Sequence, residues 1–309
     1  AMQADVYTLI IDTKEELEKW QEIACNEAVK AGLCDKSKYG QFMTGYFILG
    51  SDIAYNGKYT TYKTFMDFGN LYNWGKEWGD GSSFGFKGIF DGKGHVIDGL
   101  AVSGRYNGFV TTLADGTIRN VAFTNAEVSD TASLIARAGF GTIENIYVSY
   151  AKIVGGTGEN VSTVFGSYDY TSRKIENLII DVTYCDFGSE VKDIWLVGGG
   201  YGTLKNVAVI GKYAVNAGNK ALITDTDVSD ASYLVHTNSY AELLADETVK
   251  ANFATLDETF WTVNDEIILP KSVTEIHKND EITIANTETE INKNSSLTLK
   301  AAGKYYAFA

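Results

Sequence analysis

The sequence predicts a mainly β protein whose body is a right-handed parallel β-helix, a solenoid, with an N-terminal capping α-helix and a short C-terminal β tail. Three observations predict this fold class. A short motif ending in asparagine recurs along the chain at intervals of one supersecondary unit. Aromatic residues, which favour strands, make up 13% of the chain. A single proline beside 31 glycines indicates a continuous body rather than domains joined by long linkers.

The repeat begins in residues 88–100, which read as a strand, a glycine-rich turn and a second strand. Its second half recurs four times as an apolar residue, a variable residue and an asparagine. The copies are GTIRNV at 116–121, GTIENI at 141–146, KIENL at 174–178 and GTLKNV at 202–207. The central apolar residues are Ile97, Ile118, Ile143, Ile175 and Leu204, at steps of 21, 25, 32 and 29 residues. We expect them to stack in the core, where each contributes roughly 1.5–3 kcal/mol.

The repeated asparagines predict a ladder of side-chain hydrogen bonds along one corner of the solenoid. Asparagine tolerates the left-handed backbone conformation that a corner needs, and a buried amide must find hydrogen-bond partners. Coils stacked in register supply them, because each amide can bond the amide of the next coil. The alternative is that each asparagine marks an ordinary turn, but matched positions in all four copies favour the ladder. The predicted ladder consists of Asn120, Asn145, Asn177 and Asn206.

Residues 1–45 are predicted to form an N-terminal strand and a capping helix. Residues 6–11 are apolar and read as a strand, and residues 13–31 carry apolar side chains at helical spacing up to Gly32. An amphipathic helix at this position covers the open end of a solenoid core and blocks pairing between sheet edges.

The β-helix itself is predicted to span residues 46–240, interrupted by an insertion at 54–86 that is rich in glycine and aromatic residues. The insertion lies outside the regular spacing, so its aromatic rings either pack on one another or face a sugar or a protein. Tyr72, Trp74 and Trp78 are the candidate ligand-binding residues.

Residues 240–270 read as the cap of the far end, because Ser239 can cap a short helix and an apolar cluster follows it. Residues 271–309 read as a linker and a β tail. Alternating apolar and polar residues at 281–285 and 296–300 predict two strands there. These strands are either a truncated module or extra strands docked on the solenoid.

Composition excludes several partners. The formal net charge of −14 argues against nucleic acid and anionic lipid. The chain has no run of 18 apolar residues, so we expect no membrane insertion. We also expect a monomer. No leader is visible, but Ala1 and Met2 are typical of a cloning remnant, so this does not indicate a cytoplasmic protein. The three cysteines, Cys25, Cys34 and Cys185, lack zinc-binding spacing; Cys25 and Cys34 could pair, but isolated reduced thiols are favoured.

A search for reactive groups leaves no predicted catalytic residue, cofactor or metal. The histidines His95, His236 and His277 are far apart in the sequence. Asp91, Asp98 and Asp115 could supply the clustered carboxylates of a polysaccharide-active enzyme, but each fits a turn better. A calcium ion at residues 225–227 is conceivable, although the EF-hand pattern is absent. The sequence therefore favours a protein that is not an enzyme.

The segment FDGKGHVIDGL at 90–100, followed by the repeated Gly-Thr-Ile-x-Asn, resembles the GLUG-type β-helix repeats of large bacterial cell-surface proteins. The resemblance covers roughly residues 45–270, and its Gly-Leu-x-Gly turn has drifted to sequences such as 108–110 and 133–135. The tail from residue 281 is similar to the opening strands of bacterial immunoglobulin-like repeats. The resemblance implies an extracellular location at a bacterial cell surface, and it implies no catalytic residues.

Taken together, these features favour a non-enzymatic surface module, adhesin-like, that recognises a glycan or a host surface protein through loops on a rigid β-helix. One alternative is a carbohydrate-active β-helix enzyme, a polysaccharide lyase or hydrolase. Another is a structural spacer without a ligand.

Overall fold

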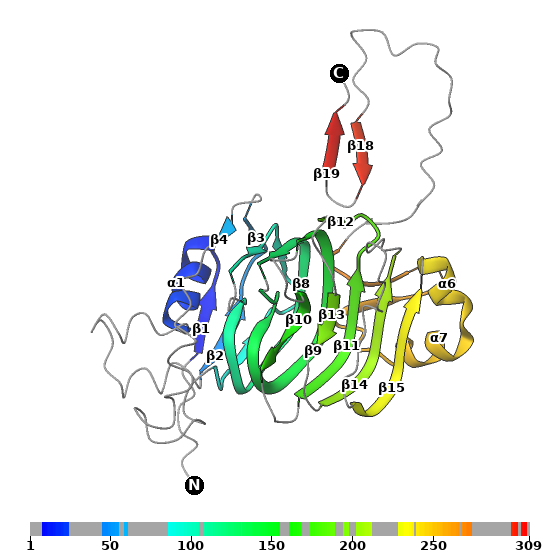
Figure 1. Ribbon diagram of the computed structural model, residues 1–309, viewed down its shortest axis with the longest axis horizontal. Coiled ribbons are helices and arrows are strands. Elements are labelled where there is room, and N and C mark those ends of the chain that lie inside the picture. The colour runs from blue at the N-terminus through cyan, green and yellow to red at the C-terminus, as the bar shows by residue number, and fades with distance from the viewer. Residues whose placement is uncertain are drawn as a thin grey trace.

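The computed structural model describes residues 8–24, 45–55, 59–60, 86–104, 108–130, 132–154, 161–168, 173–188, 194–197, 202–211, 228–237, 239–265, 267–273, 298–301 and 304–307. The described chain is mainly β (Figure 1). Its first half contains β1 (Thr8–Ile11), α1 (Lys14–Ala24), β2 (Tyr46–Leu49), β3 (Ile53–Ala54), β4 (Tyr59–Thr60), β5 (Ile89–Asp91), β6 (Val96–Asp98), β7 (Ala101–Val102), β8 (Val110–Ser129) and β9 (Ala136–Val154).

The second half continues the strands and then adds two helices. Its elements are β10 (Val161–Tyr168), β11 (Arg173–Asp181), β12 (Asp186–Phe187), β13 (Ile194–Val197), β14 (Gly202–Ile210), β15 (Val228–Thr237), α6 (Tyr240–Ala245), α7 (Glu247–Phe253), β16 (Trp261–Val263), β17 (Ile268–Pro270), β18 (Thr298–Ala301) and β19 (Lys304–Ala307).

A large parallel sheet forms the body of the molecule. Its main path is β1-β2-β5-β8-β9-β11-β14-β15, and shorter strands such as β6, β7 and β10 branch from this path. Figure 1 shows the strands side by side, running from blue at one end to yellow at the other. The sheet stays open over the described residues. The expected mainly β class is therefore confirmed, with parallel pairing throughout this sheet.

The strand β8 bends, so that its parts pair with three strands that follow one another in the sequence. Residues 117–119 pair with β5, residues 122–124 with β6, and residues 127–128 with β7. The bends coincide with left-handed residues, Asn120 at φ 53° and Asn125 at φ 50°. Asparagine adopts this conformation at low cost, which explains why it occupies the bends.

The apolar residues of the repeat form one column through the sheet. Strand register places Ile118, Ile143, Ile175 and Leu204 opposite one another, and all of them are buried. The prediction that Ile97 begins this column is wrong, because Ile97 pairs with Phe123, whereas Phe90 pairs with Ile118. After β5 a glycine turn stands where the later strands have their asparagine bend. The column residue of this first unit is therefore Phe90, which precedes the turn, and not Ile97, which follows it.

The helix α1 supplies side chains to the end of the main core. Its N-terminus is capped reciprocally: Thr13 Oγ1 accepts from the Glu16 amide, and Glu16 Oε2 accepts from the Thr13 amide. Leu17 and Trp20 are buried, and the Trp20 ring lies 4.8 Å from the ring of Phe90. The helix is described as far as Ala24; the remainder of the predicted range 13–31 lies outside the described residues.

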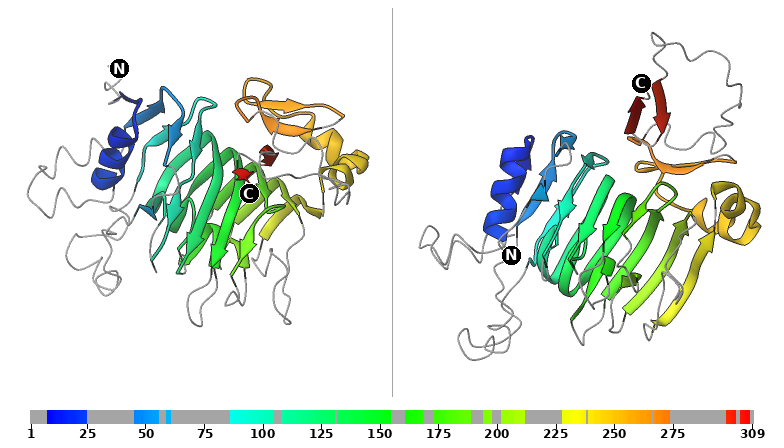
Figure 2. Two further views of the ribbon diagram at one scale, coloured as in Figure 1. Left: turned by 90° about the horizontal axis from the view of Figure 1, so that it is seen from above. Right: turned by 45° about the horizontal axis from the view of Figure 1, so that its top comes forward.

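A second core lies on the outer face of the sheet, under residues 240–273, which we call the covering segment. Ala122, Tyr147, Ile179 and Ala208, from four neighbouring strands, pack against its apolar side chains. Ser239 caps α6 as expected, but Asp246 ends α6 and caps α7, so one predicted helix is two. The helices contact β14 and β15, whereas the antiparallel pair β16–β17 extends back over the flank of the sheet (Figure 2).

Several predictions concern other parts of the chain. β18 and β19 form an antiparallel hairpin that overlaps the predicted strand at 296–300. Tyr72, Trp74, Trp78, Cys25, Cys34, His277 and residues 225–227 and 281–285 lie outside the described residues. None of the helices in the described ranges is long and apolar enough to cross a membrane.

Candidate functional site

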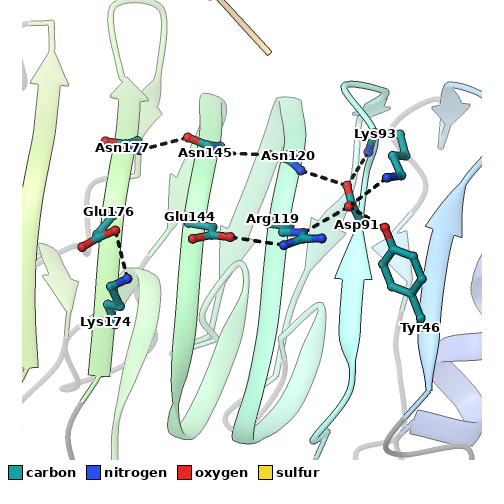
Figure 3. Close-up of polar contacts among 10 residues, drawn as sticks. All are labelled: Tyr46, Asp91, Lys93, Arg119, Asn120, Glu144, Asn145, Lys174, Glu176 and Asn177. Carbon is teal, nitrogen blue, oxygen red and sulfur yellow. Dashed lines mark hydrogen bonds and ion pairs between the residues drawn. The ribbon is translucent and has the colours of Figure 1, made fainter. Parts of the chain in front are cut away.

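The most concentrated group of polar side chains surrounds Asp91, at the end of β5. Its side chain is 1% exposed. Oδ2 accepts from the Tyr46 hydroxyl at 2.8 Å and from Arg119 Nε at 3.1 Å, and it lies 3.3 Å from Lys93 Nζ. Oδ1 accepts from Asn120 Nδ2 and from the Lys93 amide, both at 3.0 Å. We call these five residues the Asp91 cluster (Figure 3).

The cluster favours an ionised Asp91. Burial acts to raise the pKa of this carboxyl, but the hydrogen bonds from Asn120 and the Lys93 amide lower it. The Tyr46 hydroxyl and the charge of Arg119 act in the same direction, so the pKa of Asp91 lies below its ordinary value. A hydrogen bond with Tyr46 and the nearby Asp91 charge in turn raise the pKa of Lys93.

The four predicted asparagines continue from this cluster as one file. Asn145 Nδ2 donates to Asn120 Oδ1 at 3.1 Å, and Asn177 Nδ2 donates to Asn145 Oδ1 at 3.0 Å. Asn206 Nδ2 donates to Asn177 Oδ1 at 3.0 Å. All four have φ between 51° and 55°. The structure thus brings these residues together at one bend of the sheet, and the file starts on the carboxylate of Asp91.

The covering segment reaches the file from outside. Trp261 Nε1 donates to Asn145 Oδ1 at 3.2 Å, so this oxygen accepts two hydrogen bonds. The Trp261 ring meets the Phe260 ring edge-on at 4.9 Å and is 1% exposed. Asn145 is therefore bonded both along the file and to the covering segment.

Beside the file, strand register aligns one outward position of each strand into a charged row (Figure 3). Arg119, Glu144, Glu176 and Lys205 occupy this position on β8, β9, β11 and β14. Arg119 Nη1 lies 3.6 Å from Glu144 Oε1, and Lys174 Nζ lies 3.1 Å from Glu176 Oε2. Because Arg119 is 32% exposed and Lys174 is 48% exposed, this row faces solvent.

A second polar file lies at the next bend, and sequence reasoning missed it. Thr124 Oγ1 and Asn125 Nδ2 both donate to Asp98 Oδ1 at 2.7 Å. The backbone N–H of Asn125 donates to Ser149 Oγ at 3.2 Å, and Ser149 pairs in register with Asp181. These positions carry Asp, Thr, Ser and Asp and not one repeated residue type, so no repeated motif identifies them. The available signal was a polar residue, Thr124, Ser149 or Asp181, directly after three of the buried apolar triplets.

The remaining candidates from the sequence have separate positions. Asp115 is exposed at a bend, with φ 67°. His95 Nδ1 lies 2.9 Å from Asp52 Oδ1, which also accepts from the Val96 amide. Asp91 and Asp98 belong to different bends, so the three aspartates do not share a site. The described ranges contain no group of three or more His, Cys, Asp or Glu side chains that could hold a metal ion.

The polar side chains fall into two sets, those bonded within the sheet and those that face solvent. Asp91 accepts hydrogen bonds through both carboxylate oxygens, and Asp98 accepts two through Oδ1, whereas the charged row presents donors and acceptors to solvent. Such a face can hydrogen-bond an extended polar ligand across the strands. Comparison of the chain with protein-family models, with curated proteins and with solved structures found no significant match.

Proposed function

We propose that the chain is a right-handed parallel β-helix, capped at its N-terminal end by α1, that serves as a non-enzymatic binding module at a bacterial cell surface. The pairing of β8 with β5, β6 and β7 in turn supports the solenoid, because one winding of the chain would lie along the previous one. The ligand is a glycan or a surface protein. The GLUG-like repeat supports the surface location.

One observation carries the non-enzymatic function: two of the three carboxylates suggested as catalytic groups, Asp91 and Asp98, serve the scaffold. Asp91 accepts from residues on β2 and β8, and Asp98 accepts twice from β8. A catalytic carboxylate must instead reach a proton or a sugar carbon of the substrate. The proposed binding surfaces are the outer charged row and the aromatic insertion with Tyr72, Trp74 and Trp78.

A glycan array, a host-protein array and a reducing-sugar assay on the same preparation test this function. We expect binding without release of reducing ends. Trp74→Ala and Trp78→Ala should weaken binding if the insertion takes part, and Tyr72→Phe serves as the mild control. Wild-type protein that binds nothing on either array would support the spacer instead.

A polysaccharide lyase or hydrolase is the second candidate, and the charged row supplies its one favourable observation. Glu144 and Glu176 are half-buried on neighbouring paired strands, which are spaced at about 4.8 Å. Retaining glycosidases hold two carboxyl groups about 5–5.5 Å apart. Turnover of a polysaccharide that is lost in Glu144→Gln or Glu176→Gln would establish this function.

A further inference from the structure

We propose that the charged row binds a linear acidic polysaccharide in which uronic acids alternate with neutral sugars, lying across the strands. This assignment rests on the proposed binding function and names its ligand class and site. The site consists of the row residues Arg119, Glu144, Glu176 and Lys205, together with Lys93 beside Arg119 and Lys174 beside Glu176.

The charge of the row differs from that of the whole chain. The chain has 26 basic and 40 acidic residues, whereas the site has four basic side chains, Lys93, Arg119, Lys174 and Lys205, and two acidic side chains that reach solvent, Glu144 and Glu176. Lys93 is 48% exposed, and Lys205 is exposed as well. The acidic residue of the Asp91 cluster is buried beneath the cations and is 1% exposed. The surface offered to a ligand is therefore positive at both ends.

The order of charges along the row sets the order of sugars. Arg119 lies one strand from Glu144 on one side, and Lys174, which is paired with Glu176, lies one strand from it on the other side. Arg119 and Lys174 are therefore separated by two strand steps, or about 9.5 Å. This separation matches one disaccharide of an extended β-linked chain. A uronate carboxylate would bind at each end, and the hydroxyls of a neutral sugar would donate to Glu144. Thr142, half-buried two residues before Glu144, adds a hydroxyl on the same outward side.

Arg119 is fixed before a ligand arrives. Asp91 Oδ2 holds its Nε at 3.1 Å, and Glu144 Oε1 lies 3.6 Å from its Nη1. A guanidinium has five N–H donors, so donors remain for a carboxylate. Because its orientation is already set, less side-chain entropy is lost on binding.

Titration with three oligosaccharides of equal length tests the assignment. The probes are a hyaluronan decasaccharide, which alternates uronic acid and neutral sugar, an oligogalacturonate, and a neutral chito-oligosaccharide. We expect the tightest binding for hyaluronan. Oligogalacturonate should bind more weakly, because one of its carboxylates would face Glu144, and Glu144→Gln should strengthen its binding. Neutral sugar should bind weakest.

Charge reversal locates the site on the row. The double variant Lys174→Glu and Lys205→Glu should weaken hyaluronan binding by about tenfold or more, with a loss that shrinks in high salt. Lys271→Glu, a reversal at an exposed position of the covering segment, is the matched control and should have little effect. Both lysines of the row are exposed, so circular dichroism of the double variant should match that of the wild type.

Two results would overturn the assignment: equal affinity for neutral and alternating oligomers, or equal losses in the row variant and the Lys271→Glu control. Hyaluronan binding that is unaffected by the row variant but lost in Trp74→Ala would place the site on the aromatic insertion and not on the row. It would refute this assignment but not the proposed binding function. Wild-type protein that binds no sugar and no protein would instead refute the binding function itself.

Discussion

The side-chain amide of Asn120 donates to Oδ1 of Asp91 over 3.0 Å, so the file of asparagines begins on a buried carboxylate. The same carboxylate accepts from Tyr46 and Arg119 through its other oxygen. Asp91 therefore joins β2, β5 and β8 at the point where the file begins. A charged acceptor strengthens such hydrogen bonds relative to neutral pairs, which suits the first position of the file.

Removal of this carboxylate should destabilise the protein strongly. Asp91→Ala leaves the Asn120 side-chain amide without its acceptor and removes the buried counter-ion of Arg119 and Lys93. We expect a loss of about 2–4 kcal/mol in the free energy of unfolding, below that of a fully buried pair because Arg119 and Lys93 can turn to water. Urea unfolding measures it. Glu144→Ala, which removes a half-buried partner of Arg119, is the matched control and should cost less than about 1 kcal/mol.

Asp91 should also make stability depend on pH in acid. Its folded-state pKa lies below its ordinary value, so between the two values the unfolded state binds more protons and stability rises with pH. The contribution is complete above the unfolded pKa of about 3.9 and is lost as pH falls through the folded pKa. Urea unfolding at intervals from about pH 2 to 6 should show a shallower slope in Asp91→Asn. Equal slopes in the wild type and in Asp91→Asn would show that folding does not lower the pKa of Asp91.

The sequence was sufficient to predict the positions of the asparagines, because one residue type recurs at one offset from a buried apolar residue. It was not sufficient to predict where the file begins, because the first unit uses Asp91 and a glycine turn in place of an asparagine bend. Ile97 gives a first step of 21 residues, whereas Phe90 gives 28, which is closer to the later steps of 25, 32 and 29. Strand register, which depends on the neighbouring chain segments, decides between them.

Long-range packing explains the other differences. The second polar file uses Asp98, Thr124 and Ser149, three residue types that no periodic search would group together. The outer core joins Tyr147 to side chains about a hundred residues further along the chain. Periodicity within one strand shows which residues face outward, but it does not show what covers them.

Asn145 should be more important than Asn206, although both belong to the file. The Asn145 side chain donates once and accepts from Asn177 and Trp261, and its φ of 52° disfavours alanine. Asn145→Ala should cost about 2–4 kcal/mol, because three hydrogen bonds are lost and backbone strain is added. Asn206→Ala should cost less, and Asn145→Gly should recover the part due to strain. Thermal and urea unfolding of all three variants measure this order.

The Trp261 contact should couple the covering segment to the file. Trp261→Phe keeps an aromatic ring beside Phe260 but removes the N–H that reaches Asn145 Oδ1 at 3.2 Å. We expect a loss of about 1 kcal/mol. In a double-mutant cycle with Asn145→Ala the two losses should not add, because both variants remove the same hydrogen bond. Additive losses would mean that the contact contributes nothing to stability.

The glycine that opens a repeat should resist substitution, for a reason that the motif alone does not show. A Cβ on Gly116 would lie 2.4 Å from the Phe86 carbonyl oxygen, which belongs to the neighbouring chain segment. Backbone atoms cannot move aside as a flexible side chain can, so Gly116→Ala should push the two segments apart. We expect a loss of about 1–3 kcal/mol. Thr117→Ala, at the adjacent outward position, is the control and should change the midpoint of urea unfolding only slightly. A Gly116→Ala midpoint equal to that of the control would contradict the close approach of the two segments.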